Sequence, residues 1–304
     1  YVDFHTLLQM AAVRIKNDVN GDCELRVANP KNKNTKRFLK LQNIKWLMVD
    51  EYQDLSRPFF DLISAIKEHN PEIKIFCVGD DWQAINGFAG SDLEYFINFE
   101  KIFPNGKKLY LLENRRSMSN IVDMSNRVMG GGETAATSIG VGGEIISLLY
   151  DNYTKDSKGP ERLKIFSLIM FHLFCNNDQS IAFLARSNTP YGIDLETLKR
   201  ELLAILPEDH KELFKNKCSF KTVHSYKGKE SEVVVVLDSD SFGYDHPNNK
   251  YFEIFRSRED LYQEERRVFY VAQTRAKSKL IMLAQNRDRL SPFAQECFAP
   301  KDIV

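Results

Sequence analysis

The stretch WLMVDEYQD at residues 46–54 runs four apolar residues directly into two adjacent carboxylates, Asp50 and Glu51. The apolar run predicts a strand at 46–49. Asp and Glu are poor strand residues, and neighbouring carboxylates repel each other. Their place at the end of a strand indicates that something positive, such as a metal ion, binds there. The alternative is an ordinary solvated strand end.

Composition narrows the class of protein. The chain has 304 residues, of which 43% are hydrophobic, and its 42 basic residues balance its 42 acidic ones. This length suits one large or two medium domains, and zero net charge gives no hint of a nucleic-acid or membrane partner. Five widely spaced cysteines without a C-x-x-C fit neither a disulfide framework nor a zinc site. We expect a reducing, cytoplasmic compartment and no membrane span.

Strand and helix patterns alternate along the chain, which predicts an α/β fold. In the first part, a strand at 46–49, a helix from Pro58 to Asn70 and a strand at 73–78 predict a parallel sheet covered on both faces. The basic segment 28–40 is interpreted as a solvated loop rather than a phosphate-binding patch, and the glycine-rich segment 130–143 as a flexible loop. The second part has predicted strands and helices at 145–149, 181–185, 194–206, 233–237, 262–277 and 279–284.

Ligands of open α/β sheets bind at the carboxyl ends of the strands, where Asp50 and Glu51 stand. One acid could hold the shell of Mg²⁺ while its neighbour orients an attacking water. Gln83 follows Asp80 and Asp81 after the second strand, and its amide could sense a phosphate. Phe88 is flanked by small residues, so its ring could stack on a base, although a single Phe more often belongs to a core.

Basic residues in the second part suit contacts with phosphate. Arg115 and Arg116 follow an apolar strand candidate in LLENRRS at 111–117, and surface salt bridging is the alternative. The mixed segment TVHSYKGKE at 222–230 suits a phosphate backbone. Arg275 is expected on the helix 262–277, close to Val271 and Ala272, and directed into an interface.

Five ordered segments together resemble the motifs of superfamily 1 DNA helicases of the UvrD/Rep type. The opening DFHTLL resembles the D-F-x-x-L-L segment that precedes motif II in this family. The short middle region, DDWQAI and KGKE resemble the bacterial helicase IV branch. The segments that resemble motifs II to VI are VDEYQD, VGDDWQAINGFAG, LENRRS, TVHSYKGKE and EERRVFYVAQTRA.

The resemblance implies a P-loop NTPase fold with two RecA-like parallel-sheet domains, ATP between them and single-stranded DNA across them. Residues 1–112 would be the rear part of an incomplete first domain, with motifs II and III. Residues 113–304 would be the second domain, with motifs IV to VI and a reduced helical insertion. The implied function is a bacterial, ATP-dependent DNA helicase that moves 3′ to 5′ in repair or recombination. Its partners would be single-stranded DNA and duplex junctions.

The resemblance also implies a role for each matching residue. Asp50 would bind Mg²⁺, Glu51 would activate water, and Gln83 would couple the γ-phosphate to the DNA site. Two arginines would reach the γ-phosphate, Glu230 would meet the ribose, and a further group would contact DNA. The arginines are Arg116 and Arg275, and the DNA contacts are Phe88, Thr222, His224, Ser225 and Lys227.

Two features depart from the family pattern. Asn86 stands where these helicases usually have an aromatic residue, and Ala89 where an arginine occurs. Loss of one stacking ring would weaken the DNA site by roughly 1–3 kcal/mol.

The phosphate-binding loop G-x-x-x-x-G-K-[ST] is absent from the sequence. The expected explanation is that the chain is the C-terminal part of a longer helicase, lacks its N-terminal partner segment and does not hydrolyse ATP by itself.

Other functions remain open at this point. A non-catalytic RecA-like module that binds nucleic acid or regulates another protein is the main alternative, but it would have no need of Glu51, Gln83, Arg116 and Arg275 together. A helicase–nuclease has no space for its nuclease after motif VI. A doubly wound oxidoreductase would need a G-x-G-x-x-G turn, which does not occur. An RNA substrate is also open, because no feature here reads a 2′-hydroxyl.

Overall fold

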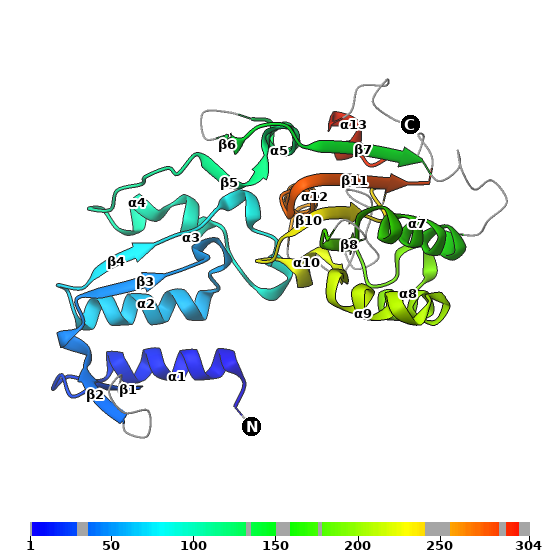
Figure 1. Ribbon diagram of the computed structural model, residues 1–304. Coiled ribbons are helices and arrows are strands. Elements are labelled where there is room, and N and C mark those ends of the chain that lie inside the picture. Colours follow the sequence, from blue (N-terminus) through cyan, green and yellow to red (C-terminus); the bar gives the residue numbers. More distant parts are fainter. Residues whose placement is uncertain are drawn as a thin grey trace. The chain divides into compact units, whose positions relative to one another are not determined.

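The computed structural model describes residues 2–28, 36–131, 135–149, 159–175, 178–240, 256–285 and 290–297 (Figure 1). The chain forms two compact units, Tyr1–Lys108 and Leu109–Val304. Within the described ranges, no helix has both the length and the apolar character needed to cross a membrane. Parallel strands and helices alternate in both units, which confirms the predicted α/β class.

The first unit contains two helices of thirteen residues beside two small sheets. Helix α2 begins where Pro58 occupies its first turn, as predicted, and Asn70 follows its last residue. The Asn70 side-chain amide donates to the carbonyls of Leu41 (3.1 Å) and Ile44 (2.8 Å), which ties this helix end to the chain ahead of β3. The elements are α1 (Phe4–Lys16), β1 (Glu24–Ala28), β2 (Lys36–Lys40), β3 (Trp46–Val49), α2 (Arg57–His69), β4 (Lys74–Cys77), α3 (Glu94–Ile97) and α4 (Phe99–Ile102).

Strands β3 and β4 pair in parallel, with Trp46 opposite Lys74 and Val49 opposite Cys77. Leu47 and Val49 pack with Ile63 of α2 in one apolar cluster. The alternate residues point to the other face, where Met48 is 72% exposed. The prediction of a sheet covered on both faces is therefore wrong for the described residues, because only one face has a helix packed on it.

The segment interpreted as a solvated loop is partly a strand. Strand β2 pairs antiparallel with β1, and Phe38 lies opposite Arg26. The prediction failed because β2 is basic and lacks the apolar alternation of a half-buried strand. Residues 29–35 of this segment lie outside the described residues.

The second unit is larger and has one central sheet. Its elements are β5 (Glu113–Met118), α5 (Ser119–Val128), β6 (Thr137–Gly140), β7 (Glu144–Leu149), α7 (Gly159–Phe174), β8 (Ile181–Ala185), α8 (Leu195–Ile205), α9 (Glu208–Lys217), β9 (Cys218–Thr222), α10 (Val223–Tyr226), β10 (Ser231–Val236), α12 (Arg258–Gln273), β11 (Ala276–Ala284) and α13 (Pro292–Cys297). The predicted strands β7, β8, β10 and β11 are all present.

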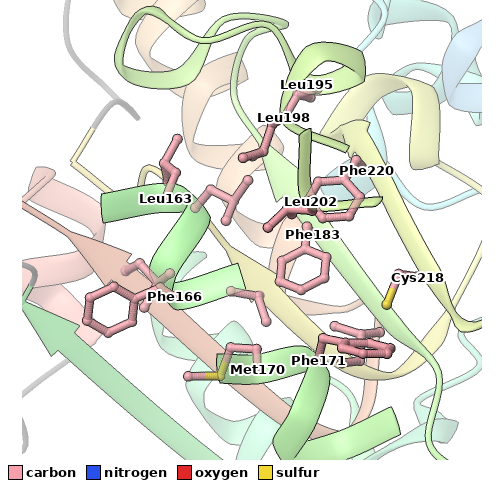
Figure 2. Packing of buried hydrophobic residues seen from close by; sticks show 14 of the residues in the cluster. Leu163, Phe166, Met170, Phe171, Phe183, Leu195, Leu198, Leu202, Cys218 and Phe220 are labelled. Carbon is pink, nitrogen blue, oxygen red and sulfur yellow. The ribbon is translucent and has the colours of Figure 1, made fainter. Parts of the chain in front are cut away.

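The central sheet has the order β7-β11-β10-β8-β9, and every neighbouring pair is parallel (Figure 1). Figure 2 shows the core on one face, where side chains of α7 and α8 meet those of β8 and β9. The rings of Phe183 and Phe220 stack there with centroids 4.4 Å apart. Helix α12 covers the opposite face, where the Gln273 amide contacts the sulfur of Met282 at 3.8 Å. Helices on both faces explain why β10 is fully apolar from Val233 to Val236.

Several predicted elements differ from the structure. Helix α12 ends at Gln273, so Arg275 lies in the turn before β11 rather than on a helix. Strand β6 lies inside the segment predicted as a flexible glycine-rich loop. Helices α7 and α9 were not predicted; α7 is apolar around much of its circumference and does not show a clear helical stripe. The residues between β5 and β9 therefore contain more helix than the leucine-rich α8.

Candidate active site

The first group of candidate residues lies at the carboxyl ends of β3 and β4. Asp50 and Glu51 follow β3 directly and are exposed. Glu51 adopts a left-handed conformation (φ 51°, ψ 44°), which costs a residue with a side chain roughly 1–3 kcal/mol. The Glu51 N–H donates to Asp50 Oδ1 at 2.9 Å. This sharp turn leaves both carboxylates at the surface while Tyr52 and Gln53, the next two residues, are buried.

A chain of hydrogen bonds joins Glu51 to Gln83. The Gln53 amide nitrogen donates to Glu51 Oε2, and Gln53 Oε1 accepts from the Asp80 N–H at 3.0 Å. Asp80 Oδ2 then accepts from Gln83 Nε2 at 2.7 Å. The structure therefore brings together two of the predicted residues, through Gln53 and Asp80.

Backbone pairing explains why these segments meet. The Val78 N–H donates to the Val49 carbonyl, and the Tyr52 N–H donates to the Val78 carbonyl, both at 2.9 Å. The two parallel strands therefore end side by side. Tyr52 anchors the turn, because its ring is packed edge-on against Phe99 and burial raises the pKa of its hydroxyl.

Phe88 and Asn86 lie further along the same unit. Phe88 is 54% exposed, in a short 3₁₀ turn that ends at Gly90 with φ 86°. An exposed ring agrees with the predicted stacking role and removes the alternative that Phe88 belongs to the core. Asn86, which replaces the usual aromatic residue, donates its side-chain amide to Asp54 Oδ2 at 2.9 Å. At this position the chain therefore has a side chain that hydrogen-bonds within the first unit instead of an aromatic ring.

The second group lies in the other unit, around Glu230. Arg116 does not follow a strand but lies within β5, and its Nε donates to Glu230 Oε2 at 2.9 Å. Lys277 Nζ lies 2.8 Å from the other carboxylate oxygen. Hydrogen bonds from Lys277 and then Arg116 hold the pKa of Glu230 below its usual value, while the pKa of Lys277 is raised by the same contact. The predicted Arg116 and Glu230 are thus directly paired.

Arg275 joins this group through Thr274. Its side chain is only 1% exposed, and its Nη2 donates to Thr274 Oγ1 at 3.1 Å. Arg116 Nη1 donates to the carbonyl of Thr274 at 3.4 Å. Arg275 Nε also donates to the Val271 carbonyl at 3.1 Å, so the predicted neighbourhood of Val271 is correct although the helix has ended. Arg116 and Arg275 therefore both contact Thr274, and Arg116 in turn links this threonine to Glu230.

An open cavity of about 560 Å³ lies beside this group. This volume is within the range of small-molecule sites. Its lining carries three cationic groups and one carboxylate, a composition that suits an anionic ligand with a polar body. The lining residues are Asn114, Arg115, Arg116, Glu230 and Lys277.

The segment predicted to contact a DNA backbone forms a tight turn after β9. Thr222 caps the short helix α10, and the Ser225 N–H donates to Thr222 Oγ1 at 3.3 Å. Val223 and Tyr226 are buried, whereas Ser225 is exposed and His224 and Lys227 are partly exposed. Gly228 follows with φ 79°, a conformation that favours glycine. The four predicted DNA contacts of this segment therefore share one surface turn.

The fit of a magnesium ion depends on Asp50. Mg²⁺ usually keeps several waters and binds one or two carboxylates together with substrate phosphates. An exposed carboxylate at a strand end meets that requirement. No group of three or more His, Cys, Asp or Glu side chains that could hold a metal exists within the described residues. The residues present thus fit a substrate-associated ion.

Sequence reasoning missed three members of these groups. Gln53 lies inside the quoted motif, but nothing local shows that its side chain turns inward. Lys277 and Thr274 flank Arg275 and Ala276 in TRAK, and only the pairing of β10 with β11 places Lys277 beside Glu230. Each group is contained in one unit, so the predicted convergence of both groups on one nucleotide stays a prediction.

Two models of known families match the chain. Residues 2–104 match the model of the UvrD/REP helicase N-terminal domain, and residues 195–287 match that of the UvrD-like helicase C-terminal domain. The chain belongs to the UvrD/REP helicase family. The two matches together include most of the predicted site residues, all except Arg116. The resemblance stated from the motifs is therefore confirmed.

Individual relatives show how much of a UvrD-type helicase the chain covers. It is 26% identical to DNA helicase IV of Escherichia coli (strain K12) over 263 residues, which are 83% of this chain and 35% of that protein. It is 34% identical to the ATP-dependent DNA helicase PcrA of Leuconostoc citreum over 88 residues, 29% of this chain and 12% of that protein. The chain thus spans about a third of the length of helicase IV.

A solved structure also resembles the chain. It is the C-terminal domain of a "possible DNA helicase" from Lactobacillus plantarum WCFS1, with 16% sequence identity and a TM-score of 0.35. The match covers 61% of this chain and 94% of that domain.

Proposed function

We propose that the chain is the C-terminal part of an ATP-dependent DNA helicase or translocase of the UvrD type. The observation that supports the proposal is that each unit holds a group of side chains whose chemistry suits nucleotide hydrolysis. The first unit presents Asp50, Glu51 and Gln83 at the ends of two parallel strands. The second unit pairs Arg116 with Glu230, and both Arg116 and Arg275 contact Thr274.

Each group has a chemical task in this proposal. A bound Mg²⁺ would neutralise phosphate charge, and Asp50 would hold its shell of waters. Glu51 would orient the attacking water and take its proton. Arg116 and Arg275 would stabilise the charge that develops on the γ-phosphate, and Glu230 would accept a hydrogen bond from the ribose. Phe88 and the turn at 222–227 would contact single-stranded DNA through stacking and the phosphate backbone.

Ligand binding in the second unit requires an exchange of partners. Arg116 is held by Glu230 at 2.9 Å in the structure. A γ-phosphate would have to draw the guanidinium away, while Lys277 keeps Glu230 paired at 2.8 Å. Both groups of this pair are partly exposed, so breaking it for such an exchange would cost little free energy.

The finer parts of the proposal follow the family resemblance. We propose 3′ to 5′ movement, a role in DNA repair or recombination, and action on single strands and duplex junctions in the bacterial cytoplasm. The N-terminal part of the same protein would supply the phosphate-binding loop, which this sequence lacks. The residues of this chain are then necessary for hydrolysis but not sufficient.

A phosphate-release assay with single-stranded DNA tests the proposal. We expect no turnover from this chain alone, and DNA-stimulated turnover from the longer protein that contains it. Glu51→Gln in the longer protein should lower turnover by about 100- to 10,000-fold and leave a small residual rate, while ATP binding persists. A longer protein without turnover would favour the non-catalytic binding module, and turnover by this chain alone would refute its predicted inactivity.

A further inference from the structure

The side chain of Gln53 lies between the two strand ends that carry the candidate catalytic residues. It is fully buried, unlike the exposed Asp50 and Glu51 that precede it. Its two polar atoms contact different segments: Nε2 donates to Glu51 Oε2, and Oε1 accepts from the Asp80 N–H at 3.0 Å. A buried amide with both ends satisfied is rigid, and it transmits the position of one segment to the other.

The chemistry of its neighbours fixes the orientation of this amide. A backbone N–H can only donate, so the Gln53 oxygen must face Asp80. The amide nitrogen must then face Glu51, whose ionised carboxylate can only accept. No flipped arrangement satisfies both partners. Gln53 is therefore suited to hold one carboxylate oxygen of Glu51 in a fixed place.

Two local constraints support this arrangement. Glu51 stands in a left-handed conformation, so its backbone directs the side chain along a path that few residues adopt. Gly79 lies directly against the amide, and a Cβ built there would come within 2.5 Å of Gln53 Oε1. The space for the Gln53 side chain thus depends on a glycine at the end of β4.

We propose that Gln53 is a positioning residue that holds Glu51 for catalysis and couples it to Gln83 through Asp80. This inference rests on the proposed function, because it assigns Glu51 the task of orienting water. Gln53 itself touches neither ATP nor DNA. Its amide replaces the water that would otherwise hydrate one side of Glu51, so that the carboxylate presents its other oxygen to the reaction.

Kinetics of the longer helicase test the proposal. Gln53→Met keeps the size of the side chain and removes both hydrogen bonds. We expect kcat for DNA-stimulated ATP hydrolysis to fall about 10- to 100-fold, the usual effect of losing a supporting contact, with KM for ATP within about two-fold. Gln53→Glu should be at least as harmful, because it sets a second carboxylate against Glu51. Gln9→Met, at an exposed position of α1, is the matched control and should change neither constant.

A double-mutant cycle separates positioning from a general structural effect. If Gln53 acts through Glu51, adding Gln53→Met to Glu51→Gln should not lower the residual rate further. Gly79→Ala would place a Cβ 2.5 Å from Gln53 Oε1 and 2.8 Å from the ring of Phe96, so it displaces the same amide and provides the test if Gln53→Met fails to fold. It should also lower kcat, and its effect should not add to that of Gln53→Met.

Each result decides the proposal. An active wild type whose Gln53→Met variant keeps its kcat would overturn the inference and leave the proposed function standing. The inference is also overturned if Gln53→Met lowers the rate of Glu51→Gln as much as that of the wild type. A wild type without turnover would overturn the proposed function and this inference together, and retained ATP-analogue binding by Gln53→Met confirms that its nucleotide site has formed.

Discussion

At the scale of single residues, the carboxylate of Glu230 forms ion pairs with two cationic side chains of the second unit. Glu230 is shared by Lys277 on one carboxylate oxygen and Arg116 on the other, at 2.8 and 2.9 Å. Its side chain is 42% exposed, so water screens both pairs. The pairing therefore orients three ionic groups at the cavity and contributes little to stability.

Acid titration should reveal this contact. The pKa of Glu230 is lowered from 4.5 in the folded protein, so the ionised form stabilises the fold above the ordinary pKa and that contribution is lost as the pH falls through the folded-state pKa. At neutral pH, Glu230→Gln should lower Tm by at most about 4 °C. The difference from wild type should shrink to zero in strong acid.

Thermal melts followed by circular dichroism across this pH range provide the measurement. Glu72→Gln, at an exposed carboxylate of the first unit, is the control and should match wild type throughout. A Tm difference for Glu230→Gln that stays constant into strong acid would show that the contact is not ionic.

Elements of the second unit are joined by a buried ion pair. Arg186 directly follows β8 and binds the carboxylate of Glu265 in α12. Its Nε donates to Glu265 Oε2 at 2.7 Å, and its Nη2 pairs with Glu265 Oε1. The backbone N–H of Arg186 also donates to Asp238, two residues after β10, at 3.0 Å. The pair therefore fixes α12 across the carboxyl ends of two strands, and through α12 it fixes the turn that carries Arg275.

Breaking this pair should destabilise the second unit strongly. Glu265→Leu leaves the Arg186 guanidinium buried without its partner, and we expect the free energy of unfolding to fall by about 3–5 kcal/mol. Replacing both residues by leucine should cost less than this single change, because no unpaired charge remains. Urea unfolding of the second unit measures both values.

Helix α12 offers a matched control for the same substitution. Glu259 is exposed, and Glu259→Leu should change the free energy of unfolding by no more than about 0.5 kcal/mol. If the Glu265→Leu variant and the double variant lose equal stability, lost packing rather than an orphaned charge is the cause.

The whole molecule consists of two compact units with a border between Lys108 and Leu109. Residues 107–112 have no regular secondary structure. Leu109 is 87% exposed and Leu111 is 93% exposed, although both are apolar. The border therefore places large side chains in solvent on a backbone that no sheet or helix protects.

Limited proteolysis should cut the chain at this border. Chymotrypsin cleaves after large apolar and aromatic residues, and exposed irregular backbone is its preferred substrate. We expect early cleavage within 109–112 that yields a fragment containing the second unit, identified by mass spectrometry. Strand β8 is equally apolar but buried, and should resist under the same conditions.

A triple variant with serine at positions 109, 110 and 111 is the control for this experiment. It removes the preferred side chains at exposed positions outside every strand and helix, so cleavage at the border should slow by at least about ten-fold while cuts elsewhere keep their rate. Border cleavage that is absent from the wild type would indicate that this segment is protected in solution.

Local patterns in the sequence were enough to predict several elements. The run 46–49 forms β3, Pro58 lies in the first turn of α2, and the valine run forms most of β10. These predictions hold because the signals involved act over a few neighbouring positions. The signals are the spacing of apolar residues, the Pro and Asn residues that bound a helix, and the preference of valine for strands. The placement of Asp50 and Glu51 after a strand is equally local.

Tertiary structure alone decided the rest, because it depends on partners far away in the chain. The apolar residues 109–112 form no strand. The charged segment that follows forms β5, because it pairs with β6 and Asn114 lies opposite Ser138. Arg116 meets Glu230 across 114 positions, and Gln53 reaches Asp80 across 27. A β-strand forms only when a second strand pairs with its backbone, and a buried amide is stable only with a donor and an acceptor beside it. The strand β5 and the inward side chain of Gln53 therefore depend on residues that are distant in the sequence, and local patterns could not predict them.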